Sequence, residues 1–402
     1  MKGFCMSTLK KNLEKTSAIC VSMWIVWSGV LFAQNTVYHS VAYPYDADSR
    51  FPQTLGSVVK ALPDLLSDVQ SNPAGLAQFT TAQIIFQTSP HFSHYAVESE
   101  IQSAASFNEF QLNAGHFAVS FPGFFLKKRT VLGFSSSQIA GPEFEVYPVL
   151  NEINTIKIDH SRNGYVGNAS IGVGMQVTDH LSLGISLTKW FGYWSWNDKM
   201  GENTAAGTFH FPGYSSAVSL RRQFGKVTLA AVAHSPFTLM KADDVQVDMW
   251  DMGYFSTFSH HFTGAARLAV AYHITPQLTL GAGYRYQGPI IVQNDVKGIM
   301  NSSGEDRTGA SHQISWGGEY LFGSDKISIP VFIAFRLLSP MENERSNLFL
   351  NYQILSDNDR SWPTNEFIMG MSLLGRSFGF SFSAQWNNSA VHAMNSIAPP
   401  YS

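Results

Sequence analysis

Residues 169–188, ASIGVGMQVTDHLSLGISLT, contain the pattern on which the fold depends. After the polar turn at 178–180, apolar Leu181, Leu183 and Ile185 alternate with Ser182 and Gly184, and the run before the turn alternates in the same way. Alternation with a period of two is typical of a β-strand that has one apolar face. Two such runs joined by a short turn predict an antiparallel hairpin.

Hairpins of this kind recur along most of the chain. Their short polar turns lie around 127–129, 178–180, 224–226, 275–277, 323–325 and 375–376. The segments between successive hairpins are longer, polar and dotted with aromatic residues. Short turns at one end and long loops at the other are typical of a barrel that crosses a bacterial outer membrane. We therefore predict an all-β fold, a transmembrane antiparallel up-and-down β-barrel.

The strand count follows from the same pattern. Thirteen segments fit a strand: 81–90, 110–122, 129–139, 165–177, 180–193, 212–223, 226–235, 262–273, 277–290, 310–322, 326–338, 365–374 and 376–387. Bacterial single-chain barrels have an even number of strands, so a further strand at 389–397 would give about 14, with about 12 as the alternative. The predicted outer loops are 140–164, 195–211, 236–261, 291–309 and 339–364.

The composition agrees with a barrel. The chain has 402 residues, of which 14% are charged and 13% are aromatic. Ordinary globular proteins have about 25% charged residues. The mean hydropathy is nevertheless −0.04, because lipid-facing and lumen-facing residues alternate and cancel in the average. The net charge of −3 gives no reason to expect a nucleic-acid partner.

A secreted two-sheet sandwich would show the same alternation. Its outer face meets water and should carry many lysines and carboxylates. Here the polar face carries mostly serine, glycine, threonine and glutamine, which favours a crowded lumen. Aromatic residues near the strand ends, such as Trp190, Tyr193 and Trp386, are typical of the girdles at a membrane interface.

The N-terminus, residues 1–33, is predicted to be a signal peptide. Lysines precede an apolar run at 18–32 that ends in Ala33-Gln34. A spanning helix is the alternative, although this run is shorter than the roughly 20 residues that a span needs. Cys5 and Cys20 both lie in this segment. The processed chain would therefore have no disulfide and no thiolate metal site.

Residues 34–78 lack alternation and end in the sequence Asp68-Val-Gln-Ser-Asn72-Pro73-Ala74-Gly75. Pro73 fixes its own φ and pushes Asn72 out of the helical region, and Gly75 allows a close backbone approach or a positive φ. A simple turn that ends a helix is the alternative.

This motif resembles the Asn-Pro-Ala sequence of the FadL/OMPP1/TodX superfamily of outer-membrane transporters, which includes PorV- and PorQ-like barrels. The resemblance implies a short N-terminal hatch at 34–78 and an outer-membrane β-barrel at 79–402. The chain departs from that family in two places. Valine, leucine and proline replace the usual glycine- and alanine-rich run before the motif, and the chain ends in Pro399-Pro400-Tyr401-Ser402.

The transporter resemblance implies passive transport of hydrophobic small molecules, such as fatty acids or aromatic hydrocarbons, in contact with outer-membrane lipid. Resemblance to PorV and PorQ implies the alternative, a component of type IX protein secretion with secretion-system proteins as partners. No catalytic motif, metal-ligand spacing or nucleotide loop is present, so we expect no enzyme activity, no metal and no cofactor.

The predicted cargo contacts are loop aromatics and lumen arginines. Trp194, Trp196 and Trp250, together with Phe209, Phe211 and Phe255, could bind cargo or simply anchor and pack the loops. The arginines could bind a carboxylate headgroup or could pair with Glu319 or another inward acid. These arginines are Arg267, Arg285 and Arg336.

Overall fold

A computed structural model describes residues 54–99, 102–140, 158–200, 203–249, 252–297, 302–324, 327–339, 343–344, 364–374 and 379–388. The predicted signal peptide and the predicted strand at 389–397 lie outside these residues.

The described chain begins with three short helices, followed by strands. The helices are α3 (Leu55–Val58), α4 (Leu65–Ser71) and α5 (Pro73–Leu76). No helix among the described residues is long and apolar enough to cross a membrane. The strands are β1 (Gln83–Ser99), β2 (Gln102–Phe125), β3 (Lys128–Ala140), β4 (Ile158–Thr178), β5 (Leu181–Met200), β6 (Asn203–His210), β7 (Gly213–Phe224), β8 (Val227–His234), β9 (Phe237–Met249), β10 (Met252–Phe262), β11 (Ala265–His273), β12 (Leu278–Gln287), β13 (Ile290–Lys297), β14 (Ser302–Thr308), β15 (Ser311–Ser324), β16 (Ile327–Leu338), β17 (Asn343–Glu344), β18 (Thr364–Leu374) and β19 (Gly379–Asn388).

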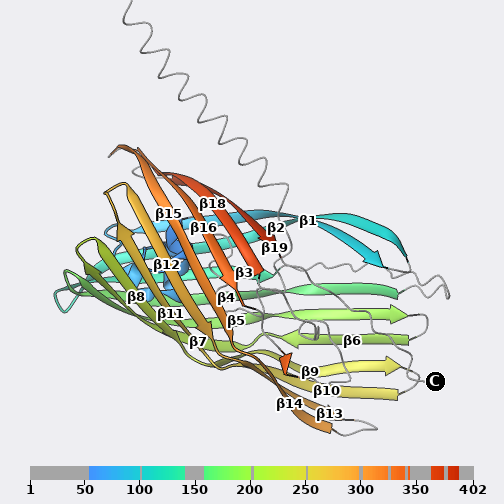
Figure 1. Cartoon of the computed structure of the whole chain (residues 1–402). Helices are drawn as coiled ribbons and strands as arrows, with labels where there is room; N and C mark the ends of the chain where they lie inside the picture. Colours follow the sequence, from blue (N-terminus) through green and yellow to red (C-terminus); the bar gives the residue numbers. More distant parts are fainter. Residues whose placement is uncertain are drawn as a thin grey trace, which may run out of the picture.

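The strands form one antiparallel β-barrel wall, and each of the thirteen predicted segments overlaps an observed strand. β1 to β5 pair in chain order. The wall continues through β7, β8, β11, β12, β15, β16, β18 and β19, each of which pairs with the next. Figure 1 shows the helices (blue) enclosed by these strands.

The two faces of the wall differ as the alternation predicts. On β5 the apolar side chains point outward, with 58% of Ile185 and 51% of Leu187 exposed. Their neighbours Ser182, Ser186 and Thr188 face the interior and are almost completely buried. All described strands belong to one sheet, which favours a barrel wall over the two stacked sheets of a sandwich. The exposed band is the surface that a transmembrane barrel presents to lipid.

The prediction of irregular outer loops is wrong for three of the five segments. Residues 195–211, 236–261 and 291–309 mostly form strands, β6, β9, β10, β13 and β14 among them, which extend the sheet beyond the barrel (Figure 1). The two-residue apolar pattern in these segments is short, as at Val245 and Val247 of β9, or absent, as in β14. The backbone groups of adjacent hairpins nevertheless satisfy one another by pairing. Residues 158–164, the end of the predicted loop at 140–164, belong to β4. Most of 339–364 and all of 141–157 lie outside the described residues.

The extension is separated from the barrel by a row of strand breaks. Breaks between paired strands fall at 211–212, 235–236, 263–264, 288–289 and 309–310, and each contains or borders a proline or glycine. Proline cannot donate to the ladder and glycine weakens a strand, so these residues end one strand and begin the next at the same level.

Candidate functional site

The candidate site is the Asn72–Gly75 motif, where the segment that contains α3, α4 and α5 (residues 55–76) meets the barrel wall. We call these residues the hatch, after the predicted element to which they belong. α4 ends at Ser71, and Asn72 has φ −155° and ψ 65°, so the chain turns there before α5 begins at Pro73. Pro73 is the first residue of α5, where its fixed φ fits a helix and its missing N–H is no loss. Asn72, Pro73, Ala74 and Gly75 are all buried.

Asp68 holds the motif together from within the hatch. Its carboxylate Oδ2 accepts a hydrogen bond from the backbone N–H of Asp64 at 2.9 Å. The side chain of Asn72 donates its Nδ2 to the carbonyl of Lys60 at 2.8 Å. A Cβ at Gly75 would overlap Oδ2 of Asp68. Gly75 is therefore required for close approach, and it is not among the glycines with positive φ.

The part of the wall that faces the motif contains four glycines. We call them the glycine patch: Gly133 on β3, Gly172 and Gly174 on β4, and Gly184 on β5. Gly133 lies opposite Gly172, and Gly174 lies opposite Gly184. A Cβ at Gly172 would lie 2.7 Å from the carbonyl oxygen of Val69, and one at Gly184 would lie 2.7 Å from that of Pro73. The hatch backbone therefore rests directly on the wall backbone.

Hydrogen bonds fix the hatch to the wall near the motif. The backbone N–H of Ala74 donates to Oγ of Ser219 on β7 at 2.7 Å. The backbone carbonyl of Gln70 accepts from Ser186 on β5 at 3.1 Å. The side-chain oxygen of Gln70, Oε1, accepts a hydrogen bond from Nδ2 of Asn168 on β4, also at 3.1 Å. Since these bonds join buried polar groups, losing any one of them removes a hydrogen bond that water replaces less readily than it would at the surface.

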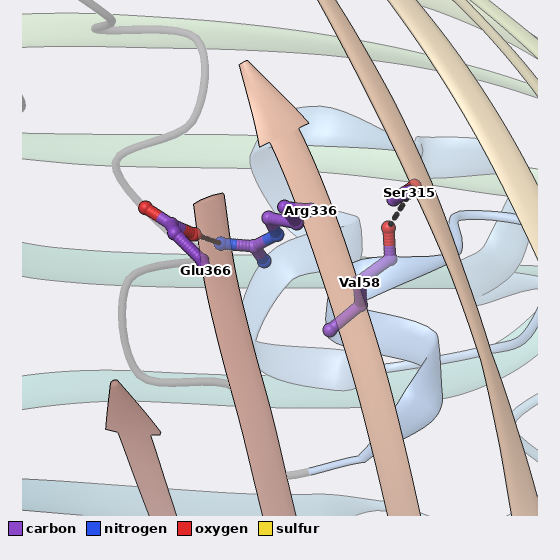
Figure 2. A network of polar contacts seen from close by, with 4 residues as sticks. All are labelled: Val58, Ser315, Arg336 and Glu366. Carbon is purple, nitrogen blue, oxygen red and sulfur yellow. Dashed lines mark hydrogen bonds and ion pairs between the residues drawn. The ribbon is translucent and has the colours of Figure 1, made fainter. Parts of the chain in front are cut away.

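Residues 55–61, the part of the hatch that precedes α4, are bonded to β15 and β7 of the wall. Glu319 on β15 accepts a hydrogen bond from the N–H of Leu55 at 3.2 Å. Ser315, also on β15, donates to the carbonyl of Val58 at 3.3 Å (Figure 2). Arg221 on β7 donates its Nε to the carbonyl of Ala61 at 3.2 Å. The hatch thus spans the lumen and is held on several sides.

Apolar packing accompanies these bonds. Leu65, Val69 and Leu76 of the hatch form one buried cluster with Ala118 and Val131 of the wall. A second cluster joins the α3 region of the hatch to the wall; it contains Leu55, Val58, Val59, Ala61, Leu62, Ala230, Ala271, Phe332, Ala334 and Ile368. Burial of these side chains stabilises the docked hatch by roughly 25 cal/mol per Å² of apolar surface removed from water.

The hatch also contains a buried carboxyl group, that of Asp68. Burial raises the pKa of Asp68 well above 3.8, and the neighbouring Asp64 raises it further. Lys60 and Arg221 oppose this rise through their positive charge. Asp68 therefore favours its neutral form more strongly than an exposed aspartate does.

The three predicted lumen arginines do face the interior, but they occupy different places. Arg267 and Arg285 lie directly opposite each other on β11 and β12, and both are buried. Arg336 on β16 forms an ion pair with Glu366 on β18, with Nη1 and Oε2 3.2 Å apart (Figure 2). For Arg336 the structure therefore shows the predicted pairing with an inward acid. The acid is Glu366, and Glu319 is used by the hatch instead.

The predicted loop aromatics are only partly placed. Trp194 and Trp196 lie on the extended part of β5, Phe209 on β6 and Phe255 on β10, whereas Trp250 lies outside the described residues. Phe211 is completely buried at the row of strand breaks. The contribution of these aromatics to cargo binding stays a prediction.

Sequence reasoning missed most of the hatch–wall contacts. The glycine patch was visible only as small residues alternating with apolar ones, and nothing in that pattern tells which glycines meet the hatch. No sequence pattern indicated that Ser219 or Lys60 would contact the motif. Asp68 stands four residues before Asn72, the spacing that places two side chains on one face of a helix, and this was the one available clue.

Comparisons with known proteins agree with this architecture. No family model and no curated protein matches the sequence. Among solved structures, the CymD monoaromatic hydrocarbon channel matches with a TM-score of 0.53 at 12% identity, over 85% of this chain and 93% of the channel. A FadL homologue from Pseudomonas aeruginosa matches with a TM-score of 0.52 at 13% identity, over 82% of this chain and 87% of that one. The resemblance predicted from the Asn-Pro-Ala-Gly motif is confirmed at the level of the fold.

Proposed function

We propose that this chain, which has the fold of the FadL-type outer-membrane barrels, is a passive outer-membrane transporter of hydrophobic small molecules. The observation that carries the proposal is the hatch, which is built on the Asn72–Gly75 motif and docked across the interior of the barrel. A barrel with a lipid-facing band and an internal hatch can separate two compartments and still admit selected molecules. The fold shared with a monoaromatic hydrocarbon channel supports the same function.

The mechanism needs no covalent chemistry. A hydrophobic molecule leaves water for an apolar site near the extracellular extension, gaining roughly 25 cal/mol per Å² of buried surface. It then enters a lumen in which the hatch is bonded to several strands. Passage requires some of these contacts to open, and those of the Asn72–Gly75 motif are local and few enough to break without unfolding the wall.

Uptake in a deletion strain tests the proposal. Radiolabelled fatty acids and small aromatic hydrocarbons are supplied to the strain without the gene and to the strain complemented with it. We expect complementation to restore uptake of at least one class, and a comparison of the two classes identifies the cargo. Unchanged uptake across a broad panel of both classes would refute the proposal. A complemented strain carrying Trp194→Ala and Trp196→Ala tests the predicted aromatic contacts separately.

The second candidate from the sequence, a PorV- or PorQ-like role in type IX protein secretion, has no further observation in its favour among the described residues. Recovery of secretion-machinery proteins with the detergent-extracted barrel would favour it. We expect neither enzyme activity nor a cofactor in either role, and a lipid-hydrolysis assay on the purified protein checks the former.

A further inference from the structure

At the short-turn end of the barrel, the end of the hairpin of β2 and β3 has no described ladder pair with the neighbouring strands β1 and β4. The ladder between β1 and β2 ends at Ser120, and the ladder between β3 and β4 begins at Thr130. For residues 124–129, the described pairs are those across the hairpin itself. We call residues 124–129 the hairpin tip.

The hairpin tip combines exposed apolar side chains with positive charge. Phe124, Phe125 and Leu126 are 82%, 62% and 77% exposed. They are followed directly by Lys127 and Lys128, which are also exposed. A single exposed apolar residue is ordinary, but three consecutive ones mark a contact surface. The adjacent ammonium groups make this surface suitable for an anionic partner.

The backbone of the tip is held in an unusual conformation. The two turn residues, Leu126 and Lys127, have φ of 49° and 62°. Positive φ at both positions is the requirement of a type I′ turn, which normally selects asparagine or glycine. In the turn between β7 and β8, the residue with positive φ is a glycine, Gly225, at 56°. A leucine and a lysine in such positions are strained, and strain of this kind concentrates at functional segments.

The tip is continuous with the lipid-facing band. Phe125 lies on the same face of β2 as Phe121, because four residues separate them and the strand period is two. Phe121 is half exposed and meets Phe134 of β3 edge to face, with ring centroids 6.4 Å apart. Lys128 is the cross-strand partner of Phe125. The tip thus places an aromatic ring, with a lysine beside it, at the end of the apolar lipid-facing band. In this arrangement the ring can lie among the lipid acyl chains while the lysine ammonium group reaches the lipid headgroups.

We propose that the hairpin tip is a membrane anchor that binds the phosphate groups of anionic phospholipids in the periplasmic leaflet. Short turns face the periplasm in this type of barrel, so the tip lies at that leaflet. Phe125 packs against the acyl chains, and Lys127 and Lys128 contact the phosphates. This inference does not depend on the identity of the cargo.

Native mass spectrometry of the detergent-purified barrel tests the anchor by titration with phosphatidylglycerol and, separately, phosphatidylcholine. The wild-type protein should retain phosphatidylglycerol preferentially. Attraction to anionic lipid should weaken about five-fold for each lysine removed in Lys127→Ala and Lys128→Ala. Added salt should weaken the wild-type preference in the same way. Phe125→Ser should reduce retention of both lipids.

Lys189→Ala is the matched control, because Lys189 is exposed on the outer face of β5 but belongs to no such hairpin tip. It should leave the preference for phosphatidylglycerol unchanged. Circular dichroism and the unfolding temperature establish that each variant is folded. Equal retention of phosphatidylglycerol by the wild type and the double lysine variant would overturn the proposal. Full displacement of the lipid by inorganic phosphate, or lysine-dependent binding of an acidic protein without any lipid preference, would overturn it as well.

Discussion

We expect the substitution Gly184→Ala to weaken the docking of the Asn72–Gly75 motif on the barrel wall. The added Cβ would overlap the amide nitrogen of Ala74 and the carbonyl carbon of Pro73 and lie 2.7 Å from the Pro73 carbonyl oxygen. All three are backbone atoms, so no flexible side chain can move aside. Inserting a methyl group into such packing typically costs about 1–3 kcal/mol. The ratio of docked to undocked hatch should therefore fall by roughly 5- to 150-fold.

Hydrogen–deuterium exchange measures this change directly. Amides of residues 64–79 should exchange faster in Gly184→Ala by about the same factor, because exchange follows local opening. The wall strands should keep their wild-type protection. Gly123→Ala is the matched control: it lies on β2, and the nearest atom to its new Cβ is the carbonyl oxygen of Thr130 at 3.9 Å.

The reasoning would be refuted if Gly184→Ala left exchange at 64–79 unchanged while remaining folded. It would also be refuted if Gly123→Ala gave the same acceleration, because the effect would then come from the barrel as a whole. If the transport proposal is right as well, uptake of cargo in the complemented strain should rise with Gly184→Ala and stay at the wild-type level with Gly123→Ala.

Three further perturbations follow from the same contacts. Ser219→Ala removes the acceptor of the buried Ala74 amide and should lower stability by about 1–3 kcal/mol in chemical unfolding; an unchanged midpoint would contradict the contact. Because the folded-state pKa of Asp68 is raised, its contribution to hatch docking is fully present below 3.8 and is lost as pH rises through the raised pKa. Exchange at 64–79 should accordingly quicken with pH after correction for intrinsic rates, and Asp68→Asn should flatten that dependence. Glu366→Gln should destabilise the barrel by about 3–5 kcal/mol, because it removes the negative charge that forms an ion pair with the buried Arg336. The double change Arg336→Leu with Glu366→Leu should recover most of the loss in thermal unfolding. A double variant as unstable as the single one would argue against the ion pair.

The strands could be predicted closely because their signal is local. In residues 169–188 the two-residue alternation directly predicts which side chains face the lipid and which face the lumen. The extensions β9, β10 and β14 were not predicted, because the apolar alternation in them is short, as at Val245 and Val247 of β9, or absent, as in β14. They form strands by pairing with neighbouring hairpins. The positions where these extensions meet the barrel, by contrast, can be read from the sequence, because prolines such as Pro212, Pro236 and Pro289 interrupt the strands there.

Part of the candidate site could be predicted from the sequence, and part could not. By itself, the sequence determined an up-and-down barrel, its greasy outer face and a turn at Asn72–Gly75, since each depends on residues close together in the chain. Only the tertiary structure decided that Gly184 meets Pro73, that Ser219 accepts from Ala74 and that Arg336 pairs with Glu366. Each of these contacts joins residues about 30 to 145 positions apart, and their meeting is set by strand register and barrel curvature, which no short stretch of sequence records.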